Sequence, residues 1–147
     1  MQKVDQGLHK IALRADIDAL RMKEETHVSF KSVDDNHAHL LGHDGHTAIL
    51  IATAELLNNW WERIPKNKSI RLIFQPAEST LEGAKVLIHE GCLEGVEEIY
   101  GIRNTHIGRE ATISLKSGPI LAGATDVDIE VLSNQNDALT GVSHLVV

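Results

Sequence analysis

The sequence is poor in several residue types that would place it in a special class of protein. Aromatic side chains make up 3% of its 147 residues, so the core must be aliphatic. The single cysteine, Cys92, excludes an internal disulfide and fits a reducing compartment. No apolar run reaches membrane-spanning length, and the N-terminus carries no apolar signal segment. We therefore expect a cytoplasmic protein with no membrane partner.

Basic residues are also scarce relative to acidic ones. The sequence has 14 Lys and Arg residues and 21 Asp and Glu residues, which gives a net charge of −7, and no basic stripe is visible. This balance argues against a nucleic-acid partner. The hydrophobic fraction of 42% and the chain length are typical of one soluble globular domain.

Histidine, by contrast, is concentrated in one stretch. Four of the nine histidines are His37, His39, His43 and His46, and Asp44 lies among them. In a helix the last three histidines would be three or four residues apart, so their side chains could converge. Imidazole and carboxylate are the usual zinc ligands, which makes this a candidate metal site. The alternative is a solvated, histidine-rich loop that caps a helix, because no regular motif such as H-E-x-x-H is present.

Apolar runs and turn signals alternate along the chain. They predict an α/β fold with a mainly parallel sheet flanked by helices. The predicted strands are 10–15, 69–75, 96–102, 111–115 and 127–132, and the predicted helices are 45–64 and 81–91. The first half of helix 45–64 is apolar all round and should be buried. The polar stretch 20–36 is predicted to be a loop.

Carboxylates follow two of the predicted strands. Asp16 and Asp18 come at the end of the first strand, and Glu78 comes shortly after the second. Ligands gather at the carboxyl ends of strands in open α/β sheets, so all three are candidate site residues. Asp18 could instead cap a turn, and Glu78 could simply favour the first turn of the next helix. Near a histidine cluster, Glu78 suits a general base that deprotonates water.

Four segments in the same order resemble one family of enzymes. The family is that of the metal-dependent, zinc-peptidase-like amidohydrolases, including hippurate hydrolase, N-acyl-amino-acid amidohydrolase and the plant auxin-conjugate hydrolases. The segments are IALRADIDAL (11–20), GHDGHTA (42–48), RLIFQPAE (71–78) and SGPILA (117–122). The resemblance implies a partial catalytic domain at residues 1–125 and the start of a lid or dimerisation domain at 126–147.

The resemblance also implies a reaction. Family members hold two divalent metal ions, usually zinc or manganese, and cleave the amide bond of small N-acyl amino acids. Carried over by position, Glu78 matches the catalytic base and His43 matches a metal ligand. Asp16 would lie near the metals and help to orient a ligand.

The other ligand positions of the family pattern hold residues that cannot serve. They are Leu41, which has no donor atom; Ser79, a weak neutral ligand; and Arg103, which stays protonated and repels a cation. The last ligand of the family would lie beyond residue 147. Substitutes could come from His39, Asp44, His46 or His106.

We therefore expect little or no activity from this chain. The alternative is a non-catalytic fragment or pseudoenzyme that acts as a binding module. A sheet that lacks part of its cover could also self-associate through exposed apolar surface.

Overall fold

The computed structural model describes residues 8–106, 108–121, 123 and 127. The chain divides into two units, residues 1–108 and 109–147. Within the described residues, every helix and strand belongs to the first unit, in the order β1, α1, η1, β2, α2, β3. No helix of this part is long and apolar enough to cross a membrane.

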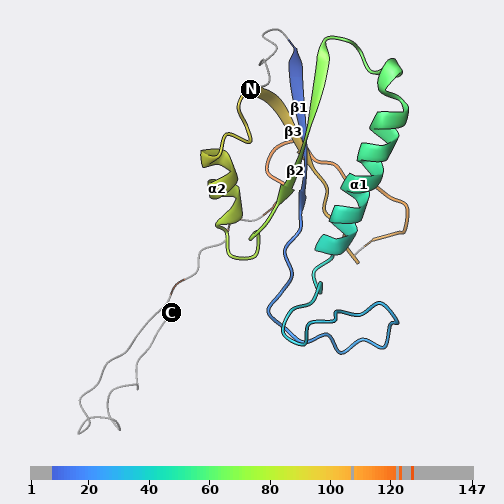
Figure 1. Cartoon of the computed structure of the whole chain (residues 1–147), viewed down its shortest axis with the longest axis vertical. Coiled ribbons are helices and arrows are strands. Elements are labelled where there is room, and N and C mark those ends of the chain that lie inside the picture. The colour runs from blue at the N-terminus through green and yellow to red at the C-terminus, as the bar shows by residue number, and fades with distance from the viewer. Residues whose placement is uncertain (1–7, 107, 122, 124–126, 128–147) are drawn as a thin grey trace, which may run out of the picture. The chain divides into compact units, whose positions relative to one another are not determined.

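The first unit is built on a three-stranded parallel sheet in the order β2-β1-β3 (Figure 1). The strands are β1 (His9–Asp16), β2 (Lys68–Gln75) and β3 (Val96–Gly101). Strands were predicted at these three places, with ends that differ by one residue at most. The expected α/β fold with a parallel sheet and flanking helices is therefore confirmed.

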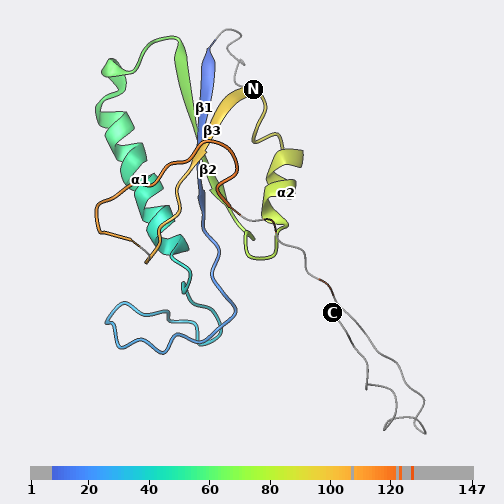
Figure 2. The ribbon, with the colours of Figure 1, turned by 180° about the vertical axis from the view of Figure 1, so that it is seen from behind.

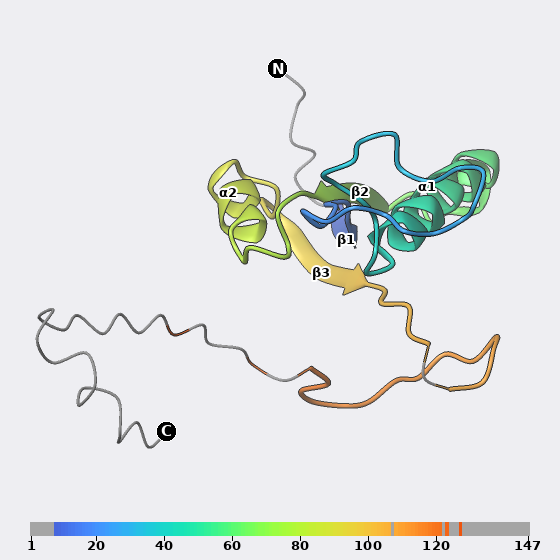
Figure 3. The ribbon, with the colours of Figure 1, turned by 90° about the horizontal axis from the view of Figure 1, so that it is seen from below.

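The two helices cover opposite faces of the sheet (Figures 1 and 3). They are α1 (His43–Asn59), followed by the short 3-10 helix η1 (Trp61–Arg63), and α2 (Gly83–His89). From β1 to β2 the chain moves one way across the sheet, and from β2 to β3 it moves the other way. Because parallel crossovers are right-handed, this reversal places the two helices on different faces.

The predicted loop 20–36 is irregular in the structure and lies beyond the carboxyl end of β1 (Figure 2). A two-residue antiparallel bridge between Leu20 and Ala38 closes its base. This bridge returns the chain to the sheet edge just before α1 begins.

One of the expected strands is absent, and another lies outside the described residues. Residues 111–115 form no strand, and Ile113 and Leu115 are 82% and 89% exposed. A strand needs a ladder partner, and no partner is paired with this segment in the described part of the chain. The predicted strand 127–132 lies outside the described residues, apart from Val127, which has no strand assignment.

The expected burial of α1 was also wrong. Ile49 and Ile51 are 42% and 49% exposed, and Leu50 is the only buried apolar residue of the helix. The helix packs one side on β1 and β2, and among the described residues no further layer covers its other side. The apolar sequence of a helix thus shows which side chains could be buried. Which of them are buried depends on the layers that pack around the helix.

The hydrophobic core of the described part is small. Its buried apolar residues are Ala12, Ala15, Ala38, Leu50 and Ile73. The largest fully buried side chains are instead Asp16, His43 and His46. Polar residues are rarely buried unless they are paired, so this cluster is a structural centre as well as a candidate site.

Candidate active site

The candidate site lies at the carboxyl end of the sheet. Asp16 is the last residue of β1, and His43 and His46 lie in the first turn of α1. Glu78 follows β2, and Arg103 follows β3. Parallel strands end at one edge, so residues far apart in the sequence are brought together there.

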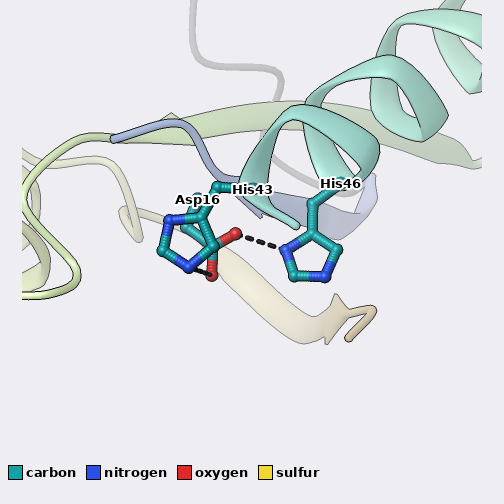
Figure 4. Close-up of side chains that lie close together, drawn as sticks. All are labelled: Asp16, His43 and His46. Carbon is teal, nitrogen blue, oxygen red and sulfur yellow. Dashed lines mark hydrogen bonds and ion pairs between the residues drawn. The ribbon is translucent and has the colours of Figure 1, made fainter. Parts of the chain in front are cut away.

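Asp16 is the anchor of the buried part of the site (Figure 4). Its Oδ1 lies 2.5 Å from His46 Nδ1, and its Oδ2 accepts a hydrogen bond of 2.9 Å from Arg14. Burial by itself raises the pKa of Asp16, but the hydrogen bond from His46 and the charge of Arg14 outweigh it, so the pKa is lowered. Asp16 is therefore a carboxylate whose charge is compensated inside the protein.

His46 has a defined tautomer. Its Nε2 accepts a hydrogen bond of 2.8 Å from the backbone N–H of Asn104, so in the neutral ring the proton is on Nδ1. That proton is donated to Asp16. Both ring nitrogens are used, which makes His46 a structural link between β1, α1 and the segment after β3.

Asn104 fixes the start of α1. Its side-chain amide donates to the carbonyl of Gly42 at 3.2 Å, and its atoms lie where a Cβ at Gly42 or Gly45 would have to go. Gly42 also has a φ of 86°, in the left-handed region that favours glycine. The two glycines of the GHDGH stretch therefore permit this close approach. Sequence reasoning missed Asn104, although the paired glycines signal a close backbone contact.

His43 is held on one side of its ring only. Its Nδ1 lies 3.1 Å from the backbone carbonyl of Asp18, which can only accept, so this nitrogen donates. In the neutral ring Nε2 then carries the lone pair, and this buried atom has no hydrogen-bond partner. It faces Glu78 Oε2 at 3.6 Å and Asp16 Oδ2 at 3.9 Å. His43 is only 1% exposed.

Asp18 lies on the Nδ1 side of the His43 ring, so it does more than cap a local turn. Its Oδ1 is 3.2 Å from His43 Nδ1, and its Oδ2 accepts hydrogen bonds from the Ser79 hydroxyl at 2.7 Å and the Ser79 N–H at 3.0 Å. Burial raises the pKa of Asp18, but the bonds from Ser79 outweigh it and lower the pKa to about 2. The backbone carbonyl of Asp18 therefore orients the His43 ring, and the Asp18 carboxylate adds a nearby negative charge.

Glu78 lies between His43 and Arg103. Its Oε2 faces His43 Nε2, and its Oε1 is 3.8 Å from Arg103 NH1. The preceding residue, Ala77, has a φ of 51°, a conformation that costs an alanine about 1 kcal/mol. The backbone is thus strained at the point where it presents the Glu78 carboxylate.

The remaining predicted residues lie apart from this centre. His37, His39, Asp44 and His106 are exposed, and His37 pairs with Asp34 at 2.7 Å. Leu41 is 46% exposed. The structure thus separates the histidine stretch into two buried residues, His43 and His46, and an exposed remainder.

In the part of the chain that the structure describes, two groups of side chains have the geometry to approach one ion: Asp16 with His43 and His46, and Asp18 with His43 and Glu78. In the first group, both nitrogens of His46 are already engaged. In the second, Asp18 contacts the Nδ1 side of the His43 ring, away from the lone pair on Nε2. His43 and Glu78 suit a metal ion, but the residues present do not fit a dinuclear centre.

The comparisons with known proteins agree with this fold. The chain belongs to peptidase family M20/M25/M40, whose model matches residues 12–144. It is 42% identical over 121 residues to N-acetylcysteine deacetylase of Bacillus subtilis, covering 82% of this chain and 31% of that protein. It is 39% identical over 127 residues to hippurate hydrolase of Campylobacter jejuni, covering 84% of this chain and 32% of that protein.

A solved structure supports the same assignment. The Bacillus subtilis YXEP protein, described as a dinuclear metal-binding peptidase of the M20 family, has a TM-score of 0.62 and 44% identity. The match covers 69% of this chain and 28% of that one. The chain thus spans about a third of the length of the relatives it matches. The expected resemblance to metal-dependent amidohydrolases is confirmed.

Proposed function

We propose that this chain carries the fold, the general base and one metal-binding histidine of an N-acyl amino acid amidohydrolase, but has little or no hydrolytic activity by itself. Glu78 is the proposed base, His43 is the one ligand position of the family that still holds a ligand-type residue, and Asp16 is the anchor of the site. The observation that supports this proposal is the chemistry of the residues around Glu78. Ser79 donates its hydroxyl proton to Asp18 and is only a weak neutral ligand, and Arg103 presents a cation without a donor atom for a metal.

The ligand class is proposed from the relatives. One similar protein is named for the deacetylation of N-acetylcysteine and another for the hydrolysis of hippurate, which is N-benzoylglycine. Both names describe cleavage of the amide bond of a small N-acyl amino acid. Because this chain spans only about a third of those proteins, the substrate and the activity stay proposals here.

The physical reason for low activity is the difficulty of activating water. A bound divalent metal ion lowers the pKa of water from about 15.7 to about 7 and polarises the substrate carbonyl. Without that help, a carboxylate such as Glu78 must deprotonate an ordinary water molecule. The barrier then stays far above that of an efficient hydrolase.

A second candidate is hydrolysis with a single zinc or manganese ion. The observation in its favour is the unpartnered Nε2 of His43, which faces Glu78 Oε2 at 3.6 Å. One histidine and one carboxylate are fewer than the three protein ligands of a usual catalytic zinc site. We therefore rank this candidate second.

One experiment separates the two candidates. The purified chain is incubated with manganese or zinc, dialysed, and analysed for metal by mass spectrometry, beside His43→Ala and the exposed control His39→Ala. Hydrolysis of N-acetylcysteine and hippurate is assayed in parallel, with Glu78→Ala as the blank. We expect the same low metal content in all variants and no hydrolysis above the blank.

The opposite result has a clear signature. About one metal ion per chain that is lost only in His43→Ala, together with hydrolysis lost in Glu78→Ala, would refute the first candidate and establish the second. Metal retained equally by His43→Ala would be bound elsewhere and would leave the first candidate standing.

We also propose that the chain self-associates. The large apolar residues Ile49 and Ile51 on α1 and Ile99 and Tyr100 on β3 are 42% to 54% exposed. Such surface is favourable to bury against a second copy. Sedimentation velocity should show a mass that rises with concentration, whereas a constant mass of 16.2 kDa would refute the proposal.

A further inference from the structure

Within the described part of the chain, the Glu78 carboxylate has two ion pairs and both are loose. His43 Nε2 lies at 3.6 Å and Arg103 NH1 at 3.8 Å, and both distances are longer than a hydrogen bond. The side chain is 29% exposed, so it is partly removed from water. A partly buried carboxylate needs a compensating positive charge.

Arg103 is placed to supply that charge. The other arginine near the site, Arg14, is already bound to Asp16 at 2.9 Å and to Gln75 at 2.8 Å. Arg103 has no such engagement with these residues, and its side chain is 50% exposed. An arginine keeps its charge at every pH at which the protein is folded.

The position of Arg103 is set by its neighbour. The backbone N–H of Asn104 donates to His46 Nε2, and its amide donates to the carbonyl of Gly42. The residue after Arg103 is therefore tied to the buried end of α1. This tie fixes the backbone beside Arg103 near the site, although β3 has already ended at Gly101.

We infer that Arg103 is the internal counter-ion of Glu78 and excludes a divalent cation from the position between Glu78 and His43. A metal ion there would lie within a few ångströms of a fixed positive charge, at which distance repulsion is strong in a partly buried site. The unpartnered Nε2 of His43 and the Glu78 carboxylate would otherwise both attract it. The inference rests on the proposed function, because it gives a physical reason for the low activity proposed there.

The test compares metal affinity among variants at one position. Arg103→Lys keeps the charge, Arg103→Ala removes it, and Arg103→His replaces it with a possible ligand. Arg63→His, on η1, is the matched control for a new surface histidine. Mn²⁺ and Zn²⁺ binding is measured by equilibrium dialysis, and Co²⁺ binding by its visible absorption.

We expect Arg103→Ala to bind metal at least about tenfold more tightly than the wild type, and Arg103→His more tightly still. Arg103→Lys and Arg63→His should match the wild type. Adding His43→Ala should abolish the gain and the Co²⁺ spectrum. Equal affinity of the wild type, Arg103→Ala and Arg103→His would overturn the inference.

A second measurement covers the case in which a variant folds poorly. Thermal unfolding in a chelator is compared for Arg103→Met, Glu78→Gln and the double variant. If the two charges compensate each other, Glu78→Gln should remove most of the loss in melting temperature caused by Arg103→Met. Additive losses would contradict the counter-ion role.

The two hypotheses fail in different ways. Equal metal affinity across the Arg103 variants, with no hydrolysis, overturns the inference and leaves the proposed function intact. Hydrolysis by the wild type in the presence of a chelator, lost in Glu78→Ala, refutes the proposed function and leaves the metal-exclusion inference intact.

Discussion

The two halves of the candidate site use the same residue types in opposite ways. On one side, His46 uses both ring nitrogens: Nδ1 donates to Asp16, and Nε2 accepts from the backbone N–H of Asn104. On the other side, His43 and Glu78 face each other at 3.6 Å, and the buried Nε2 of His43 has no partner. One half is a closed network, and the other is open.

The closed half therefore supports the fold, and the open half holds the residues that could carry out chemistry. The closed half ties β1, α1 and the segment after β3 together through bonds within the chain, so it needs no ion to be stable. The open half keeps a lone pair and a carboxylate that can act only if something is bound between them. A site can therefore keep its architecture while the chemistry depends on residues such as Arg103.

The largest expected effect comes from breaking the closed half. Asp16→Ala leaves Arg14 and His46 without their buried carboxylate, and loss of one partner from a buried network costs about 3 kcal/mol or more of unfolding free energy. Chemical denaturation measures this change. Asp44→Ala, at an exposed position of the same helix turn, is the control and should change it little. A similarly small loss in Asp16→Ala would show that the network is not a structural centre.

A smaller effect is expected where the closed half meets α1. Gly42→Ala adds a Cβ 2.3 Å from Asn104 Oδ1 and forces an alanine into a left-handed backbone conformation. We expect a loss of about 1–2 kcal/mol from the backbone cost and the displaced Asn104 bond. Gly123→Ala has nothing within 4 Å of the new Cβ and should be nearly neutral. Asn104→Ala should relieve part of the Gly42→Ala loss, and full additivity would contradict the contact.

The smallest effect concerns the support behind the open half. Ser79→Ala removes a donor to Asp18, so the pKa of Asp18 should rise from about 2 toward its ordinary value of 3.8. A carboxyl whose pKa is lowered by folding stabilises the protein above its ordinary pKa, and this contribution is lost as the pH falls through the folded value. The stability lost in Ser79→Ala should therefore be greater at about pH 6 than at about pH 2.

The Asp18 prediction is checked by carboxyl carbon NMR together with denaturation at the two pH values. An unchanged pKa of Asp18 in Ser79→Ala would mean that the backbone N–H of Ser79, at 3.0 Å, is sufficient by itself. A loss of stability independent of pH would assign Ser79 a packing role.

Much of the fold was predictable because it depends on local patterns. The apolar runs 10–15, 69–75 and 96–102 predicted the three strands, and the GHDGH stretch lies at the start of the predicted helix. The segment 111–115 has the same apolar character but forms no strand, since pairing is a property of neighbours. The prediction that α1 is buried was wrong for the same reason: Ile49 and Ile51 are apolar residues, yet they are exposed in the structure.

The site was predictable in kind but not in detail. Asp16 and Glu78 were expected at the carboxyl edge of the sheet and His43 at the start of the following helix, and the structure places these three residues close together. The support role of Asp18 and the position of Asn104 could not be derived, because each depends on a contact with a residue at least 25 positions away in the sequence.

The sequence by itself determined which atoms are available: an imidazole at His43, a carboxylate at Glu78, and residues at Leu41, Ser79 and Arg103 that offer a metal ion little or nothing. These are properties of side-chain chemistry and need no fold. Only the tertiary structure decided which histidine has both ring nitrogens hydrogen-bonded and which keeps one unpartnered. It also decided which arginine faces which carboxylate. Hydrogen bonding and charge compensation depend on distances of a few ångströms, and these are set only when the ends of three strands and one helix meet.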